Sequence, residues 1–379
     1  MDAAAEVPQG QGADPIPSSP RVDRKRRCRS VPLAGPVSKV LGYDNLLIEI
    51  LVRLPPKPSS LPRASVVCKR WGSILSDPQF LKRFREHHRK PPLLGFFRGY
   101  AKNFIPAMDS PDRIPAARFS LPKSSIPYHT DEAYMGCRHG LSLLINMHKR
   151  ETVVWDPLTG EERIVAFPPG FNSTLMWSYS GWHGTVLCVN AEDGHVHGDC
   201  FSSPFKLVLV CAEYNTPAVC SVYDSASDVW GDIFSTMTIT AGMSSLGLIE
   251  KPVENHGTDD WYFQLLRMEN DGLGLAILLD LTIKLWERKS NCDGVFEWVL
   301  LQKTIPLEGM VPRRMDSALF VGYDEDANVI VLTTITGNFT LQVDSMQIKH
   351  IVKRNNICLD TFYPYRNFYT AGRRAETQP

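Results

Sequence analysis

The stretch Leu41–Phe80, LGYDNLLIEILVRLPPKPSSLPRASVVCKRWGSILSDPQF, carries the clearest helical pattern in the chain. Its first segment places four apolar residues at i, i+3, i+4 and i+7, on one helix face: Leu47, Ile50, Leu51 and Leu54. Asp44 precedes them as a candidate N-cap, and Pro55-Pro56 ends the run. The segment therefore predicts a short amphipathic helix.

A second helix is predicted directly after the prolines. Ser59 or Ser60 can cap it, and Pro62 lies in its opening turn. Its apolar residues fall on one side: Leu61, Ala64, Cys68, Trp71 and Leu75. Because Cys68 belongs to this apolar face, we expect it to be a core residue rather than a reactive thiol.

A third helix is predicted from Asp77-Pro78, with Phe80, Leu81 and Phe84 as its apolar residues. A basic amphipathic extension, Lys82–Lys90, follows, and we expect its two histidines, His87 and His88, on the exposed side. Forty residues bury little surface alone, so amphipathic helices of this size suggest that a partner covers part of their apolar face.

This stretch resembles an F-box over essentially all of Leu41–Phe80. The most specific portion is VCKRWGSILSDPQF, which follows the pattern V-C-K-R-W-x-x-[IL]-[IL]-x-D-P-x-F. The alternative is an ordinary helical subdomain that packs only on its own protein.

Composition excludes several classes of protein. The 379 residues hold 41 Lys+Arg and 41 Asp+Glu, so no overall field points to nucleic acid or a membrane surface. No run approaches 18 uninterrupted apolar residues, and Met1–Gly10 lacks the features of a signal peptide. Nine scattered cysteines without a C-x-x-C pair indicate reduced thiols. We therefore expect an intracellular protein of the cytoplasm, the nucleus or both, with neither membrane nor nucleic acid as a partner.

The chain divides into four predicted parts. Residues 1–37 are rich in Pro, Gly, Ala and Ser and are expected to be a disordered leader. Its basic run, Arg21–Arg29, is either a nuclear import signal or a merely solvated segment. Residues 38–90 hold the helices and the basic extension, residues 91–372 form a β domain, and residues 373–379 form a frayed tail.

The β domain shows a repeated pattern of short strands and Asp-led turns. Three strands are predicted at 140–146, 151–155 and 161–167, and three more at 185–189, 206–212 and 218–223. The turn Asp156–Gly160 has Pro157 and Gly160 where a tight turn needs them, and Trp155 and Trp230 lie near the two turns. Weak repetition of this kind is typical of β-propeller blades.

This half of the chain resembles the F-box-associated domains of plant F-box proteins, which are kelch-like propellers. The matching residues are Cys137–Gly140 (CRHG), Val154–Gly160 (VWDPLTG), Val222–Ser225 (VYDS) with Trp230, and the aromatic terminus Tyr363–Tyr369. Between Phe234 and Pro252 such domains carry an aromatic strand pair, whereas this chain has a short segment rich in Ser, Gly and Thr. The predicted fold class is therefore α+β multidomain: a small three-helix F-box, then an all-β propeller-like domain with an incomplete third blade.

No catalytic, cofactor or metal site is predicted. The chain lacks G-x-S-x-G, P-loop and G-x-G-x-x-G motifs. The densest group of potential metal ligands is His183, Cys188, His195, His197, Asp199 and Cys200. Zinc sites usually contain two close ligand pairs, and that spacing is missing here. The Gly- and Asp-rich run Asn190–Asp199 therefore favours a polar solvent loop.

The F-box resemblance implies a substrate adaptor of a Skp–cullin–F-box (SCF) ubiquitin ligase. It implies docking on a Skp-type adaptor, which links the chain to cullin, while the β domain holds an unknown protein substrate for ubiquitination and proteasomal degradation. Carried over position by position, the docking residues are Leu41, Leu46, Leu47, Ile50, Leu51, Leu54, Pro55, Leu61, Val66, Val67, Cys68, Trp71 and Leu75. Some of them would form the internal core instead. The alternatives are a propeller module that binds protein or glycan beneath a helical cap, and a propeller enzyme.

Overall fold

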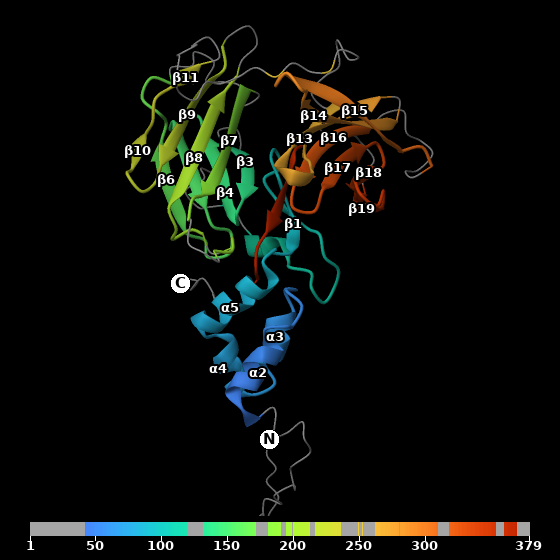
Figure 1. Cartoon of the computed structure of the whole chain (residues 1–379). Helices are drawn as coiled ribbons and strands as arrows, with labels where there is room; N and C mark the ends of the chain where they lie inside the picture. The colour runs from blue at the N-terminus through green and yellow to red at the C-terminus, as the bar shows by residue number, and fades with distance from the viewer. Residues whose placement is uncertain are drawn as a thin grey trace, which may run out of the picture. The chain divides into compact units, whose positions relative to one another are not determined.

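The structure is a computed structural model that describes residues 42–119, 121, 132–171, 181–190, 195–198, 200–212, 217–235, 249, 252, 262–279, 281–309, 318–353 and 360–369 (Figure 1). The predicted leader, its basic run, Leu41 and the tail 373–379 lie outside these residues. Packing divides the chain into two units, residues 1–47 and 48–379, with the boundary inside the first described helix. Within the described ranges, no helix is both long and apolar enough to cross a bilayer.

Four helices occupy the region where three were predicted. They are α2 (Asp44–Leu51), α3 (Ser60–Ser65), α4 (Lys69–Leu75) and α5 (Pro78–His88). The predicted second helix is thus wrong as a single element, because Cys68 is extended (φ −163°, ψ 164°) and interrupts it. The expectation for this cysteine is also wrong: Cys68 is the exposed N-cap residue of α4, not part of an apolar core face.

The last helix begins where the sequence predicted. The Asp77 carboxylate accepts a hydrogen bond from the Gln79 backbone N–H (3.2 Å), which satisfies a donor of the first turn. The predicted third helix and the basic extension form one element, α5. Of the two histidines, His87 is exposed, whereas His88 is half-buried, with its Nε2 atom 3.0 Å from the Val52 carbonyl oxygen.

The β domain consists of five antiparallel sheets among the described residues. Sheet 1 contains β1 (Leu93–Arg98), β2 (Phe104–Pro106) and β20 (Phe362–Arg366). Sheet 2 contains β3 (Glu132–Arg138), β4 (Leu141–Asn146), β5 (Glu151–Trp155) and β6 (Glu162–Ala166). Sheet 3 contains β7 (Trp182–Cys188), β8 (Phe205–Cys211), β9 (Val219–Asp224), β10 (Val229–Trp230) and β11 (Phe234–Ser235).

The remaining two sheets follow one another along the chain. Sheet 4 contains β12 (Phe263–Arg267), β13 (Leu273–Leu279), β14 (Thr282–Ser290) and β15 (Phe296–Pro306). Sheet 5 contains β16 (Ala318–Asp324), β17 (Val329–Thr334), β18 (Gly337–Gln342) and β19 (Ile348–Lys353). The strands predicted in sheets 2 and 3 are confirmed to within three residues.

The sheets are arranged as the blades of a propeller. Each sheet contributes one edge strand to the contacts between neighbouring sheets. These edge strands pack against one another in the order β7, β3, β20, β16, β12. The described residues thus form a five-bladed, propeller-like arrangement. The strand repetition predicted a propeller but not its number of blades. The segment expected to be shortened, 236–250, is described only at Ile249, so its prediction falls outside the described residues.

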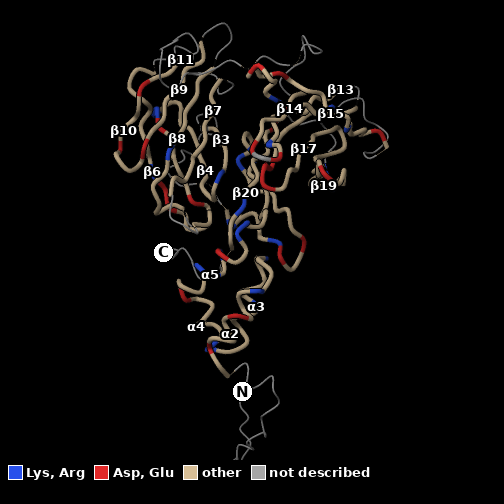
Figure 2. The backbone as a smooth tube through the Cα atoms, in the orientation of Figure 1, with Lys and Arg blue, Asp and Glu red and all other residues tan. Residues whose placement is uncertain are grey.

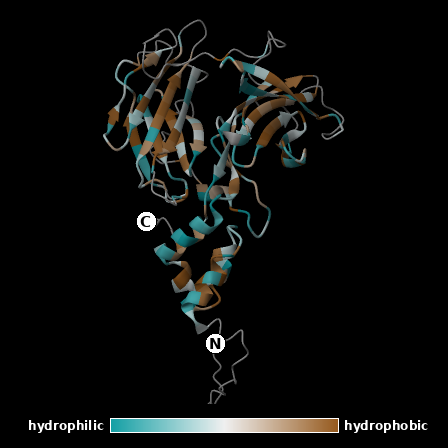
Figure 3. Cartoon of the chain, viewed as in Figure 1, coloured by the Kyte–Doolittle hydropathy of each residue, from teal (hydrophilic) through white to brown (hydrophobic). Residues whose placement is uncertain are grey.

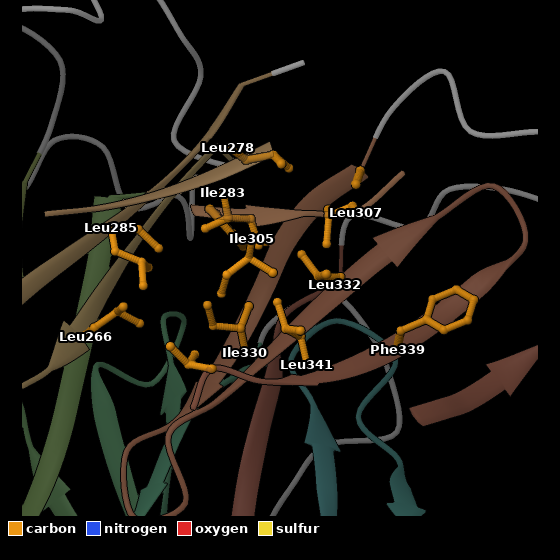
Figure 4. Close-up of a cluster of buried hydrophobic side chains, with 14 residues drawn as sticks. Leu266, Leu278, Ile283, Leu285, Ile305, Leu307, Ile330, Leu332, Phe339 and Leu341 are labelled. Carbon is orange, nitrogen blue, oxygen red and sulfur yellow. The ribbon is translucent and has the colours of Figure 1, made fainter. Parts of the chain in front are cut away.

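The largest apolar core lies between sheets 4 and 5 (Figure 4). Ile283, Ile305, Ile330 and Leu341 are fully buried there. A second core is aromatic: the Phe97 ring lies 5.0 Å from Tyr134 and 5.6 Å from Trp155 between ring centroids. Aromatic pairs at such distances add stability beyond the apolar area that they bury.

Sheet 1 joins the beginning of the β domain to its end. Strand β20 pairs antiparallel with β1, with Phe96 opposite Pro364 and Arg98 opposite Phe362. Buried ion pairs accompany the join. The Arg366 Nε atom lies 2.9 Å from Oδ1 of Asp324 on β16, and Arg98 lies 2.7 Å from Asp360. The carboxyl-terminal aromatic segment therefore docks against the first strands, as its composition predicted.

We expect Asp324→Asn to destabilise the β domain. Asp324 is 1% exposed, and the change removes the nearer and more deeply buried of the two carboxylates that pair with the Arg366 guanidinium. Asp326, 3.8 Å from Arg366 and more exposed, remains, so the loss should be up to about 3–5 kcal/mol. The measurement is the free energy of unfolding in urea. The matched control is Asp109→Asn, because its pair with Lys349 is exposed on both sides and should contribute less than about 1 kcal/mol. Equal losses in both variants would contradict this account.

Candidate functional site

The predicted docking residues fall into three groups according to their exposure. Leu46, Ile50, Pro55, Val66, Val67 and Cys68 are exposed, Leu54 and Trp71 are half-buried, and Leu47, Leu51, Leu61 and Leu75 are buried. The buried leucines are covered by the chain itself and belong to its internal core. Docking by the other residues stays a prediction.

Helical spacing explains the division within α2. Leu47 and Leu51 are four residues apart, lie on one face and are both 0% exposed. Leu46 and Ile50 have the same spacing on the neighbouring face and are 45% and 44% exposed. The helix therefore buries one apolar stripe and leaves a second in solvent.

The break between α3 and α4 exposes three consecutive residues. Val66 is 82% exposed and Val67 is 62% exposed, and Cys68 follows them at the start of α4. Figure 3 shows apolar residues interleaved with hydrophilic ones along these helices. We call Ile50, Val66, Val67 and Cys68 the uncovered apolar set. Contiguous exposed apolar groups mark surfaces that another protein covers, and this set is our candidate for such a surface.

Charged side chains fix α2 to α5 beside this set. The Glu49 carboxylate accepts a hydrogen bond from Arg53 (3.0 Å) and another from Arg83 on α5. Hydrogen bonds from Arg53, and then from Arg83, lower the pKa of Glu49 below its ordinary value. The carboxylate is therefore charged at neutral pH and links the two helices.

A second candidate site is a cavity of about 240 Å³ lined by the edge strands β3, β7, β16 and β20. Its lining includes Arg138, Tyr363 and Arg366 together with the acidic run Asp324–Asp326. Arg138 and Glu325 form an ion pair (2.8 Å) and are each about one-third exposed. Figure 2 shows both charge signs near β20. The cavity therefore offers charged groups of both signs to a ligand.

Polar groups that stay neutral line the cavity or lie next to it. Burial raises the pKa of the Cys137 thiol to about 12 and that of the Tyr363 phenol to about 12. The Tyr134 hydroxyl lies 2.7 Å from the Ser142 hydroxyl. These groups remain protonated at neutral pH, so none of them is an activated nucleophile.

Sequence reasoning did not identify this cavity. Its residues come from four strands that are far apart in the chain. The CRHG run Cys137–Gly140 and the aromatic segment Tyr363–Tyr369 gave local signals, but neither indicated that these residues meet. The potential metal ligands also come together more closely than their spacing suggested. Cys188, His195, His197 and Cys200 place one donor atom each within 4.8 Å of one another. His183 is not in this group, and Asp199 lies outside the described residues.

A match to a family model agrees with the geometry of the helices. The model of the F-box domain matches residues 44–83, which include α2, α3 and α4 and the first half of α5. Residues 44–83 are an F-box domain.

Curated relatives carry the same kind of domain. An F-box/kelch-repeat protein of Arabidopsis thaliana is 27% identical over 191 residues, covering 48% of this chain and 44% of the relative. A second one is 26% identical over 215 residues, covering 52% and 51%. An F-box protein of the same plant is 23% identical over 302 residues, covering 71% and 75%. The chain thus spans about half the length of the F-box/kelch-repeat relatives.

Among solved structures, the WD40 domain of SCAP from fission yeast matches 62% of this chain and 44% of that chain. The identity is 11% and the TM-score is 0.25.

We expect cysteine labelling to distinguish the exposed thiols from that of Cys137. At pH 8, iodoacetamide should modify Cys68, which is exposed, at least tenfold faster than Cys137, whose thiol has a pKa of about 12. The exposed Cys292 is the control for the rate of an accessible thiol. Peptide mass mapping over time measures the rates. Labelling of Cys137 as fast as that of Cys292 would contradict this assignment.

Proposed function

We propose that the chain is a substrate-recognition subunit of an SCF ubiquitin ligase. In this proposal the F-box docks on a Skp-type adaptor, the adaptor connects the chain to cullin, and the β domain holds a protein substrate. The observation that carries the proposal is the uncovered apolar set on an F-box domain. The similarity to plant F-box/kelch-repeat proteins supports it.

In this role the chain makes and breaks no bonds itself. It holds the substrate near the ubiquitin-loaded conjugating enzyme, so that transfer gains from proximity and raised effective concentration. The substrate's ubiquitination then leads to proteasomal degradation. We place this function in the cytoplasm, the nucleus or both.

Apolar side chains in the uncovered set would supply most of the docking energy. Burial contributes about 25 cal/mol per Å² of apolar surface removed from water. Ile50 and Val66 are exposed in the free chain, so binding of an adaptor that covers them is stabilised by the free energy of burying their apolar surface. A few such side chains usually dominate an interface.

We expect Ile50→Glu combined with Val66→Glu to abolish co-purification of the full chain with a Skp-type adaptor. Two charges buried without partners at the interface should weaken binding at least about 100-fold. The measurement is a titration of the purified chain with adaptor. The control is Ile164→Glu combined with Leu265→Glu, which alters exposed apolar residues on β6 and β12 and should leave binding unchanged.

A footprint provides an independent check on the docking surface. In the complex with adaptor, Cys68 should be protected from iodoacetamide, while Cys292 in the turn after β14 stays reactive. If the Ile50/Val66 variant were folded and still bound with unchanged affinity, the chain would not be an F-box adaptor of this kind. Such a result would favour a propeller module with a helical cap.

We further propose that the cavity lined by β3, β7, β16 and β20 takes part in substrate binding. Its paired charges, Arg138 and Glu325, are partly exposed and can exchange their mutual ion pair for groups on a substrate. Electrostatic complementarity of this kind gives specificity more than affinity. The substrate class follows as a protein segment that presents both charge signs.

We expect Arg138→Ala to reduce substrate capture at least about fivefold without affecting adaptor binding. The measurement is proximity labelling with the full chain under proteasome blockade, comparing proteins enriched over background. The matched control is Arg163→Ala on β6, which is equally exposed but lies outside the cavity lining. The same set of captured proteins with both variants would remove the cavity from this role.

A further inference from the structure

We propose that Cys188, His195, His197 and Cys200 form a tetrahedral Zn²⁺ site in the connection between β7 and β8. The four side chains supply two sulfur and two nitrogen donors, which is the ligand set of many structural zinc centres. None of these residues takes part in the proposed docking or substrate sites.

The distances between the donor atoms fit a single bound ion. Sγ of Cys188 lies 3.4 Å from Nε2 of His195. Sγ of Cys200 lies 3.5 Å from the same nitrogen and 3.4 Å from Nδ1 of His197. Bonds of about 2.3 Å to sulfur and about 2.0 Å to nitrogen, at tetrahedral angles, place S and N about 3.5 Å apart. These three distances match edges of a zinc tetrahedron, and all four donor atoms lie within 4.8 Å of one another.

The β7–β8 hairpin brings the donors together from both of its arms. Cys188 is the last residue of β7 and pairs with Phe205, the first residue of β8. The Val189 N–H donates to the Pro204 carbonyl (3.0 Å), which closes the base of the connection. Cys200 lies just before this base, where its carbonyl accepts a hydrogen bond from the Ser203 N–H (3.0 Å). This explains why separations of seven, two and three residues suffice, although they match no paired zinc motif.

A neighbouring turn orients the ligands from outside. Nδ1 of His139 accepts a hydrogen bond from the Cys188 backbone N–H (3.1 Å). The His139 ring also stacks on the His197 ring, with centroids 3.6 Å apart and planes 6° from parallel. Outer groups that fix the ligand rings in this way are a usual feature of metal sites.

The burial and the donor types of this group favour a divalent cation that prefers sulfur and nitrogen ligands. Cys200 is 2% exposed and Cys188 is 9% exposed. On binding, each thiol loses its proton to solvent, and the two thiolates balance the charge of Zn²⁺, while both imidazoles stay neutral. The donor set contains sulfur and nitrogen without a carboxylate, which selects zinc over magnesium or calcium.

The zinc would hold the connection against the end of β20. Gly198, between the last two ligands, is so close to this segment that a Cβ atom there would lie 3.0 Å from the Asn367 side-chain oxygen and 3.1 Å from the Phe368 ring. The Phe368 ring in turn contacts Phe84 of α5, with 6.2 Å between ring centroids. The ion would therefore stiffen the region where sheet 3, sheet 1 and α5 meet.

The test uses the full chain purified without chelator. We expect mass spectrometry of the metal content to find about one zinc per chain. Replacement by Co²⁺ should give the visible absorption of a tetrahedral ion with thiolate ligands. Removing the metal with a strong chelator should lower the melting temperature, and Zn²⁺ but not Mg²⁺ should restore it.

Cys200→Ser and His195→Asn should each weaken zinc binding at least about tenfold in competition with a chromogenic chelator. The matched controls are Cys220→Ser, a buried cysteine of β9, and His183→Asn, an exposed histidine of β7. Both controls lie outside the group of four and should retain the metal. Circular dichroism of each variant shows whether it is folded.

Three outcomes would overturn the proposal. The first is a folded wild-type chain that takes up no Zn²⁺ from a buffered excess. The second is a Cys188–Cys200 disulfide, seen as a loss of two hydrogen masses in the native chain. The third is equal zinc content in Cys200→Ser and Cys220→Ser. If a ligand variant fails to fold, the Co²⁺ spectrum of the wild-type chain still tests the proposal, because absence of the tetrahedral thiolate absorption would contradict it.

Discussion

The pairing of β20 with β1 is the constraint on which the β domain depends. Strand β20 packs against β3 on one side and β16 on the other, so a carboxyl-terminal strand connects sheets that come from both halves of the chain. The ion pairs Arg366–Asp324 and Arg98–Asp360 are buried at this join. Such charges are costly to bury unless they are paired, so they favour one register of the closing strand over its neighbours.

The β domain encloses its largest side chains, whereas the small F-box buries only part of the apolar surface of its helices. In the β domain, large side chains such as Trp155, Tyr365 and Ile330 are almost completely covered. In the F-box, Val66 and Ile50 stay in water although the helices beside them have buried leucines. A small helical unit has too little volume to cover every apolar residue that it carries. This difference explains why docking is proposed for the F-box and recognition for the polar cavity of the β domain.

Several features converge on the ends of the edge strands. The CRHG run after β3 contributes Arg138 to the cavity and His139 to the neighbouring histidine–cysteine group. Gly198 of that group lies against Asn367 and Phe368, just beyond β20. Close approach here requires residues without a side chain, and Gly198 has a φ of +132° that other residues rarely adopt. The proposed substrate cavity and the proposed zinc site are thus built from adjacent residues of different blades.

The sequence by itself determined the helical F-box, the start of α5, most strands of sheets 2 and 3 and the docking of the aromatic terminus, because these follow from local periodicity, capping and turn chemistry. Asp44, predicted as the N-cap of the first helix, instead lies within α2. Tertiary structure alone decided which apolar residues of the F-box stay exposed, since periodicity identifies an apolar face but not what covers it. It also decided the break at Cys68, the cavity and the approach of Cys188 to His195, His197 and Cys200. These depend on contacts between segments distant in sequence, or on the path of an irregular connection, and neither is encoded in residue spacing.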